Sequence, residues 1–255
     1  MTAPLTYVYC LVADRKPPST ARRPKGLPGL GPLRLLQVGE RALWLAVADA
    51  PAESYREKAI NAGLRDLDWV SRAAVAHEAV VESFLRSAAV LPMKLFTIFT
   101  SDARALEYIG ARRSAIDAAL DRVTGHDEWG IRVALDRSRP AAAARSSRTA
   151  RSGVSYLQRK KAQRDATAEL AGRARDIVAE LYDRLAGVAS AARRRAAAEM
   201  PAQGGPLLLD AAFLVPRSRA KRFNAAVRAQ TKVLGPQGYA IALSGPWPAY
   251  SFMQD

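Results

Sequence analysis

The chain has 255 residues, 49% of them hydrophobic and 25% charged, a composition that is typical of a globular protein and excludes a disordered or collagen-like chain. Lysine and arginine outnumber aspartate and glutamate by 39 to 24, and the net charge of +15 favours acidic partners of any kind. The single cysteine, Cys10, excludes an intrachain disulfide and a multi-cysteine metal site, and no apolar run is long enough for a transmembrane helix. This cysteine usage predicts a cytoplasmic protein.

The first part of the chain is predicted to form a small sheet. Residues 7–12 are rich in aromatic and β-branched side chains, as in a buried strand. Residues 15–32 contain five prolines, three glycines and five basic residues, which predicts an exposed irregular loop. Residues 33–38 and 41–48, separated by two turn residues, then predict a hairpin.

Helices are predicted next. Residues 67–88 read as one helix, because apolar side chains recur there at steps of three and four. That stripe consists of Leu67, Val70, Ala74, His77, Val81, Phe84 and Ala88. Ser101 and Asp102 form a natural N-cap pair for a second helix, which Gly125 ends. Residues 93–99, between the two helices, predict a short buried strand or a turn.

The second half predicts an open sheet covered by helices. Residues 129–135 read as a strand, residues 137–153 as a basic loop of arginine, alanine and serine, and residues 156–198 as a long helical region. An apolar strand at residues 207–215, a helix from Ser218 and a strand at residues 239–243 follow. This order predicts a strand–helix–strand crossover between parallel or near-neighbour strands.

Together these elements predict an α+β fold of two domains. The first, residues 1–125, is a small sheet with helices. The second, residues 126–255, is an α+β domain with a helical insertion at about residues 137–200.

The search for catalytic chemistry finds no cluster, so we predict neither an enzyme nor a cofactor. The helical zinc motif that His77 and Glu78 would begin lacks its second histidine. Since His77 lies on the apolar stripe, it is predicted to be a buried histidine that hydrogen-bonds a neighbour. Cys10, inside a strand, is predicted to be a buried, inert thiol. The glycines of residues 26–31 are in the wrong order for a dinucleotide loop.

The positive charge is concentrated in one segment. Residues 137–195 contain 15 basic and 5 acidic residues, which accounts for ten of the fifteen net charges. Arg193, Arg194 and Arg195 are therefore the candidate partner-binding residues, and the competing interpretation is a solvated helix end. Nucleic-acid binding stays open as the alternative function, although the segment lacks the interleaved aromatic side chains that stack on bases.

Three segments carry a resemblance to a known family. They are residues 7–9 in the first strand, His77 with residues 91–99, and the closing residues 245–252. The signature positions are His77, Pro92, Lys94, Thr97, Gly245, Pro246, Trp247, Pro248 and Tyr250. In order and spacing these segments resemble the gas vesicle GvpF/GvpL family over nearly the whole chain. Members of that family often have glycine in place of Phe96 and a second proline in place of Ala249.

The resemblance implies an accessory protein of gas vesicle assembly, located in the cytoplasm in association with gas vesicles. It implies that the partners are the small amphipathic shell subunit and other gas vesicle accessory proteins. A small-molecule substrate and a membrane are not expected, and nucleic acid is the less favoured partner. It also implies that the C-terminal domain is a modified ferredoxin-like sheet with extra helices. The signature positions are expected to be structural, with Trp247 and Tyr250 clamping the closing segment onto the body of the protein.

Overall fold

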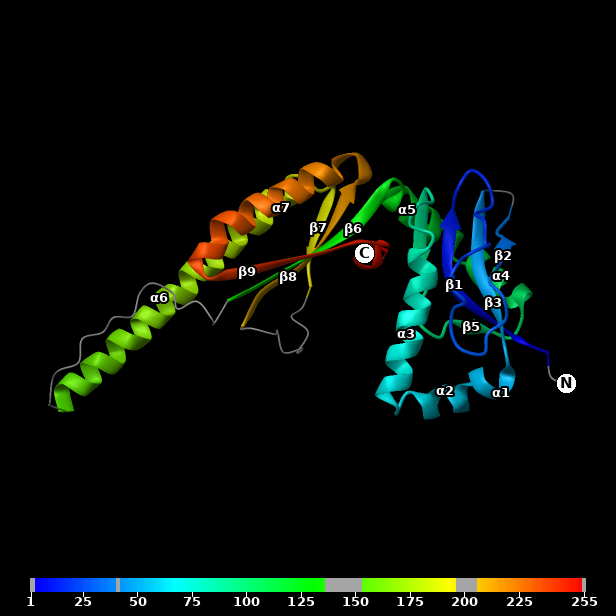
Figure 1. Cartoon of the computed structure of the whole chain (residues 1–255), viewed down its shortest axis with the longest axis horizontal. Coiled ribbons are helices and arrows are strands. Elements are labelled where there is room, and N and C mark those ends of the chain that lie inside the picture. Colours follow the sequence, from blue (N-terminus) through cyan, green and yellow to red (C-terminus); the bar gives the residue numbers. More distant parts are fainter. Residues whose placement is uncertain (1–2, 40–41, 136–152, 196–205, 254–255) are drawn as a thin grey trace. The chain divides into compact units, whose positions relative to one another are not determined.

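The computed structural model describes residues 3–39, 42–135, 153–195 and 206–253, and the chain divides into two compact units (Figure 1). The first unit is formed by Met1–Glu128 together with Pro246–Asp255, and the second by Trp129–Gly245. The second unit is thus inserted into the first along the chain. The predicted second domain, residues 126–255, extends further than this second unit, because Pro246–Asp255 group with the first unit.

The first unit is built on a sheet of order β2-β3-β1-β4, with β5 also paired to β1. Its strands are β1 Leu5–Ala13, β2 Arg34–Gln37, β3 Leu43–Ala50, β4 Ala89–Pro92 and β5 Ile98–Phe99. Residues 6–12 of β1 are all buried, which explains why the strand has apolar and aromatic side chains on both faces. Strands β2 and β3 pair antiparallel and confirm the predicted hairpin.

The loop before β2 is irregular, as its prolines predict, but it is not simply exposed. Leu27 is buried, and its N–H donates to the Tyr9 hydroxyl over 3.3 Å. The Arg23 guanidinium lies 3.7 Å from the centre of the Phe84 ring and donates to the carbonyl and hydroxyl of Ser83. Composition predicted the lack of regular structure and missed these anchors, because each one depends on a residue distant in sequence.

The described residues of the first unit form the α-helices α1 Ala52–Tyr55, α2 Glu57–Gly63, α3 Leu67–Glu82, α4 Asp102–Gly110 and α5 Arg113–Val123. The Asp66 carboxylate caps α3 by accepting the N–H groups of Asp68 and Trp69, and Ser101 caps α4 as predicted. Helix α3 ends earlier than residue 88, and the predicted helix 101–125 is divided into α4 and α5.

The predicted stripe on α3 is correct in its later turns and wrong in its first ones. His77, Val81 and Phe84 are buried, whereas Leu67 is 79% exposed and Ala74 lies on the surface. Ala73 and Val80 occupy the core positions in the remaining turns. Spacing identifies an amphipathic helix, but it does not show which of its turns reach the core.

The second unit is a four-stranded sheet of order β7-β8-β6-β9 covered by two long helices. Its elements are β6 His126–Leu135, α6 Gly153–Ala186, β7 Ala191–Arg194, β8 Leu207–Pro216, α7 Ala220–Leu234 and β9 Tyr239–Trp247. This βαββαβ order is that of a ferredoxin-like domain. Strands β8 and β9 have β6 between them, so the predicted crossover joins near neighbours rather than adjacent strands.

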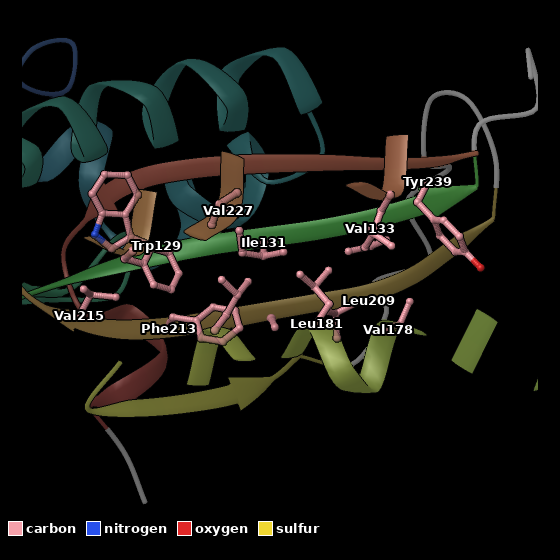
Figure 2. Close-up of a cluster of buried hydrophobic side chains, with 14 of the residues drawn as sticks. Trp129, Ile131, Val133, Val178, Leu181, Leu209, Phe213, Val215, Val227 and Tyr239 are labelled. Atoms are coloured by element: carbon pink, nitrogen blue, oxygen red, sulfur yellow. The ribbon is translucent and has the colours of Figure 1, made fainter. Parts of the chain in front are cut away.

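The core of the second unit lies between the sheet and helices α6 and α7 (Figure 2). Trp129, Ile131 and Val133 of β6 are buried in this core, and they alternate with Gly130 and the exposed Arg132 on the other face of the sheet. From α7, the predicted inward residues Phe223, Val227 and Leu234 are all buried. The stripe on α6 packs against this core from Ala174 onward, whereas Leu170 is 46% exposed.

Candidate partner-binding site

His77 links strand β1, through Tyr7, to the turn of residues 93–97 that follows β4. The His77 Nε2 lies 3.1 Å from the Met93 carbonyl oxygen, and Nδ1 lies 2.8 Å from the Tyr7 hydroxyl. Because a carbonyl can only accept, the network assigns the proton to Nε2, and Nδ1 accepts from Tyr7. The Tyr7 oxygen in turn accepts the Phe96 N–H over 3.3 Å. This chain of bonds confirms that His77 is buried and hydrogen-bonded.

Burial keeps this network uncharged. Desolvation lowers the pKa of His77, with the hydrogen bond to Met93 acting in the opposite direction. Desolvation likewise raises the pKa of Tyr7, and it raises that of Tyr9 to about 12. The imidazole and both phenols are therefore neutral at neutral pH, and the arrangement serves to position the turn.

The turn itself is fastened to β1 on both sides. Met93 N–H donates to the Tyr9 carbonyl and Val8 N–H donates to the Thr97 carbonyl, each over 2.9 Å. Within the turn, the Thr97 N–H and hydroxyl both donate to the Lys94 carbonyl, over 3.0 and 2.7 Å. Thr97 thus closes the turn, which is the structural duty expected of it, and the Lys94 side chain is exposed.

Phe96 occupies a backbone conformation that favours glycine, with φ of 62°. Its ring stacks on Trp69 at a centroid distance of 5.1 Å and an interplanar angle of 9°. We expect Phe96→Gly to be more stable than Phe96→Ala by about 1 kcal/mol, since both lose the stack and only alanine keeps the left-handed strain. Chemical unfolding of the two variants measures this difference, and equal stabilities would show that the turn relaxes.

A groove of about 340 Å³ lies on the other side of this turn, wholly within the first unit. Its lining comes from β1, β4, the turn, α4, α5 and the closing segment, namely Leu11, Leu91, Pro92, Met93, Lys94, Thr97, Tyr108, Ile109, Arg112, Ala115, Ile116, Ala119 and Met253. Most of these side chains are apolar. The groove brings together three signature residues, Pro92, Lys94 and Thr97.

The closing signature segment is anchored next to this groove. Glu128, only 2% exposed, accepts the Ser251 N–H and hydroxyl over 2.7 and 2.8 Å. Phe252 is 3% exposed, and its carbonyl accepts from Arg122 over 3.0 Å. Tyr250 is hydrogen-bonded to Glu78, whose pKa is raised chiefly by burial.

The signature residues before this anchor are less deeply placed than expected. Trp247, at the end of β9, is half-buried, and Pro246 is exposed, whereas Pro248 is buried. Gly245 has a φ of 111°, a conformation that L side chains rarely adopt. The strongest attachments are thus made by Phe252 and Ser251 rather than by Trp247. Glu128 lies in a segment, Glu128 to Gly130, that resembles the family, but its role as the acceptor for Ser251 had no signal in the sequence.

Two of the three candidate arginines, Arg193 and Arg194, lie on strand β7, and Arg195 directly follows it, so none lies at a helix end. Helix α6 ends at Ala186, and β7 then pairs antiparallel with β8, with Arg193 opposite Ala212. Alanine and arginine are good helix formers, so propensity alone extended the predicted helix to residue 198. Strand pairing with the buried strand β8 overrides that propensity.

The strand also separates the three side chains. Arg195 donates to Asp210 Oδ1 over 2.9 Å, and Arg132 donates to Oδ2 of the same buried carboxylate over 3.1 Å. Arg194 lies 4.6 Å from the centre of the Tyr182 ring on α6, and Arg193 is exposed. Asp210, which sequence reasoning overlooked, is the lone charge in the apolar run of residues 207–215, and that isolation was the available signal.

The basic segment from residue 137 to residue 151 lies outside the described residues. Among the residues that the structure does describe, no group of three metal-ligating side chains occurs, and no helix is both long and apolar enough to cross a membrane. Cys10 is buried, and burial raises the pKa of its thiol, as predicted for an inert cysteine.

Comparison with known proteins decides the family. Residues 5–254 match the family model described as gas vesicle synthesis protein GvpL/GvpF. The chain belongs to the GvpL/GvpF family. This GvpL/GvpF protein is 31% identical over 259 residues to gas vesicle protein L of Streptomyces sp. (strain CB03234), covering 97% of this chain and 92% of the relative.

Two solved structures share the fold of this family member. The gas vesicle protein GvpF from Anabaena sp. PCC7120 aligns with a TM-score of 0.72 at 15% identity, covering 99% of this chain and 97% of that one. GvpF from Microcystis aeruginosa aligns with a TM-score of 0.69 at 16% identity, covering 98% and 99%. These likenesses confirm the α+β fold of the GvpL/GvpF chain.

Proposed function

We propose that this protein is a non-enzymatic accessory component of gas vesicle assembly that binds the small shell subunit and other gas vesicle proteins during nucleation. The observation that carries the proposal is membership of the GvpL/GvpF family over residues 5–254. The proposed location is the cytoplasm, in association with gas vesicles.

The physical reason for such a component lies in the shell subunit that the family resemblance implies. An amphipathic subunit exposes an apolar face before assembly, and an exposed apolar patch of that kind aggregates. An accessory protein that covers the face transiently keeps the subunit available for nucleation. The apolar groove beside Lys94 and the exposed Arg193 supply the two kinds of contact that such a role needs.

Binding measured at low and high salt tests the proposal against nucleic-acid binding. We expect the full chain to bind the purified shell subunit with affinity that changes about threefold or less between 50 and 500 mM NaCl, because apolar burial is weakly screened. Affinity for a short DNA duplex should fall by about 100-fold or more over the same range. Tight, sequence-specific DNA binding without shell-subunit binding would refute the assembly role.

The same assay tests the arginine cluster through one residue. Arg193→Glu should weaken shell-subunit binding several-fold without loss of folding, whereas Arg195→Glu would place a second carboxylate beside Asp210 and perturb the sheet. Arg228→Glu, an equal charge reversal on exposed α7, is the matched control. Equal affinity of the Arg193→Glu and Arg228→Glu variants for the shell subunit would show that Arg193 is not part of the interface.

A further inference from the structure

The groove of the first unit combines an apolar interior with a positively charged rim. Leu11, Leu91 and Ile109 are buried at its base, and the exposed Lys94 and Arg112 stand at its edge. None of the described residues that line it is acidic. We infer that this groove binds an amphipathic helix of a partner protein, with the apolar face of the helix in the groove and an acidic side chain at Lys94 or Arg112.

The Arg112 guanidinium is positioned by Tyr108 so that it can bind a carboxylate. The guanidinium stacks 3.7 Å from the centre of the Tyr108 ring, which fixes the planar head group while leaving N–H donors for a ligand. The next residue, Arg113, is neutralised by Asp117 over 3.0 Å. In the described part of the chain Arg112 and Lys94 have no such ion pair, so the charge at this rim is uncompensated.

The backbone of the turn argues for a helix rather than a strand. An extended occupant would need free N–H and C=O groups at the groove wall, as in strand addition to a sheet edge. Here Met93 bonds through both its N–H and its carbonyl, and the N–H of Phe96 and both main-chain groups of Thr97 are also bonded within the first unit. A helix satisfies its own backbone internally and needs only side-chain contacts, which this groove provides.

Two further features fit such an occupant. Met93 and Met253 both line the groove, and flexible methionine side chains adapt to apolar faces of varied shape. The net charge of +15 disfavours a second copy of this chain as the occupant and favours an acidic partner. The inference concerns this surface whichever gas vesicle protein supplies the helix, and it does not depend on shell-subunit binding.

Binding of designed peptides to the full chain tests the inference. The probe is a fluorescein-labelled helical peptide of about 18 residues with leucines on one face and flanking glutamates. Two matched peptides replace the glutamates by lysines or the leucines by glutamines. In fluorescence anisotropy measurements, we expect the glutamate peptide to bind at least about tenfold more tightly than either of the two matched peptides.

Variants of the groove locate the binding. Ala115→Trp places a large side chain in the groove, and the double variant Lys94→Gln/Arg112→Gln removes the positive charge at its rim. Each should lower the affinity for the glutamate peptide about tenfold. Lys58→Gln/Arg65→Gln removes the same charge from an exposed surface elsewhere on the first unit and should leave affinity unchanged. Unchanged circular dichroism checks folding. Absence of peptide binding, equal affinity for the lysine peptide, or insensitivity to Ala115→Trp would each overturn the inference.

Discussion

Phe252→Ala should lower the stability of the first unit by about 3–5 kcal/mol, the usual cost of removing a buried phenylalanine. The side chain is 3% exposed, and it anchors a segment that reaches the first unit only after the chain has passed through the second. The midpoint of thermal unfolding should fall on the order of 10 °C. Calorimetry measures the shift, and hydrogen exchange should show faster exchange at residues 246–253 than in the wild-type protein.

The control for this variant keeps the segment attached. Tyr250→Phe removes only the hydroxyl that bonds Glu78 and keeps the ring, so its effect should be much smaller. A chain that stops at Gly245 tests the same attachment, because it leaves the buried Glu128 without the two donors of Ser251. If the truncated chain unfolds at the wild-type temperature, the closing segment contributes nothing to the first unit.

Tyr7→Phe should cost about 2–4 kcal/mol, although it removes a single oxygen atom, because it leaves both His77 Nδ1 and the Phe96 N–H without their partner. Tyr55→Phe is the matched control. Its hydroxyl makes one hydrogen bond, to the Pro28 carbonyl over 2.6 Å, and its loss should cost about 1 kcal/mol. Urea unfolding compares the two, and equal costs would show that the His77 network does not hold the turn.

The same network predicts how stability depends on pH. The pKa of His77 is lowered in the folded protein, so as pH falls the unfolded chain takes up the proton before the folded protein does. The neutral His77 therefore makes its full contribution to stability above about pH 6.5, the pKa of an unperturbed histidine. Stability should therefore fall as pH drops below about 6.5, until the folded-state pKa is passed. The neighbouring Tyr7 and Tyr9 have raised pKa values and do not titrate in this range. His77→Gln should flatten the profile, and an unchanged slope would assign it to carboxylates.

Elements that depend on local pattern were predictable, and those that depend on distant partners were not. The apolar run of β1, the hairpin and the cap at Ser101 were all visible in the sequence, because composition and capping act over a few residues. Strand β7 was hidden in a helix-forming stretch, since only its pairing with β8 makes it a strand.

The candidate site divides in the same way. The family resemblance identified His77, Pro92, Lys94 and Thr97, but no pattern indicated that three of them line a groove with residues of α4 and α5. Glu128 lies 123 positions from Ser251, a separation over which a single sequence gives no pairing signal. Charge density drew attention to Arg195, which shares the buried Asp210 carboxylate with Arg132.

The insertion of one unit within the other also sets an order of events during synthesis. Residues 246–253 leave the ribosome after the whole of the second unit, yet Met253 lines the groove and Phe252 is buried in the first unit. A nascent chain can form the sheet of the first unit early, but it has no finished groove until those residues emerge. Capture of a partner helix at this groove would then be confined to molecules that have been translated at least as far as Met253.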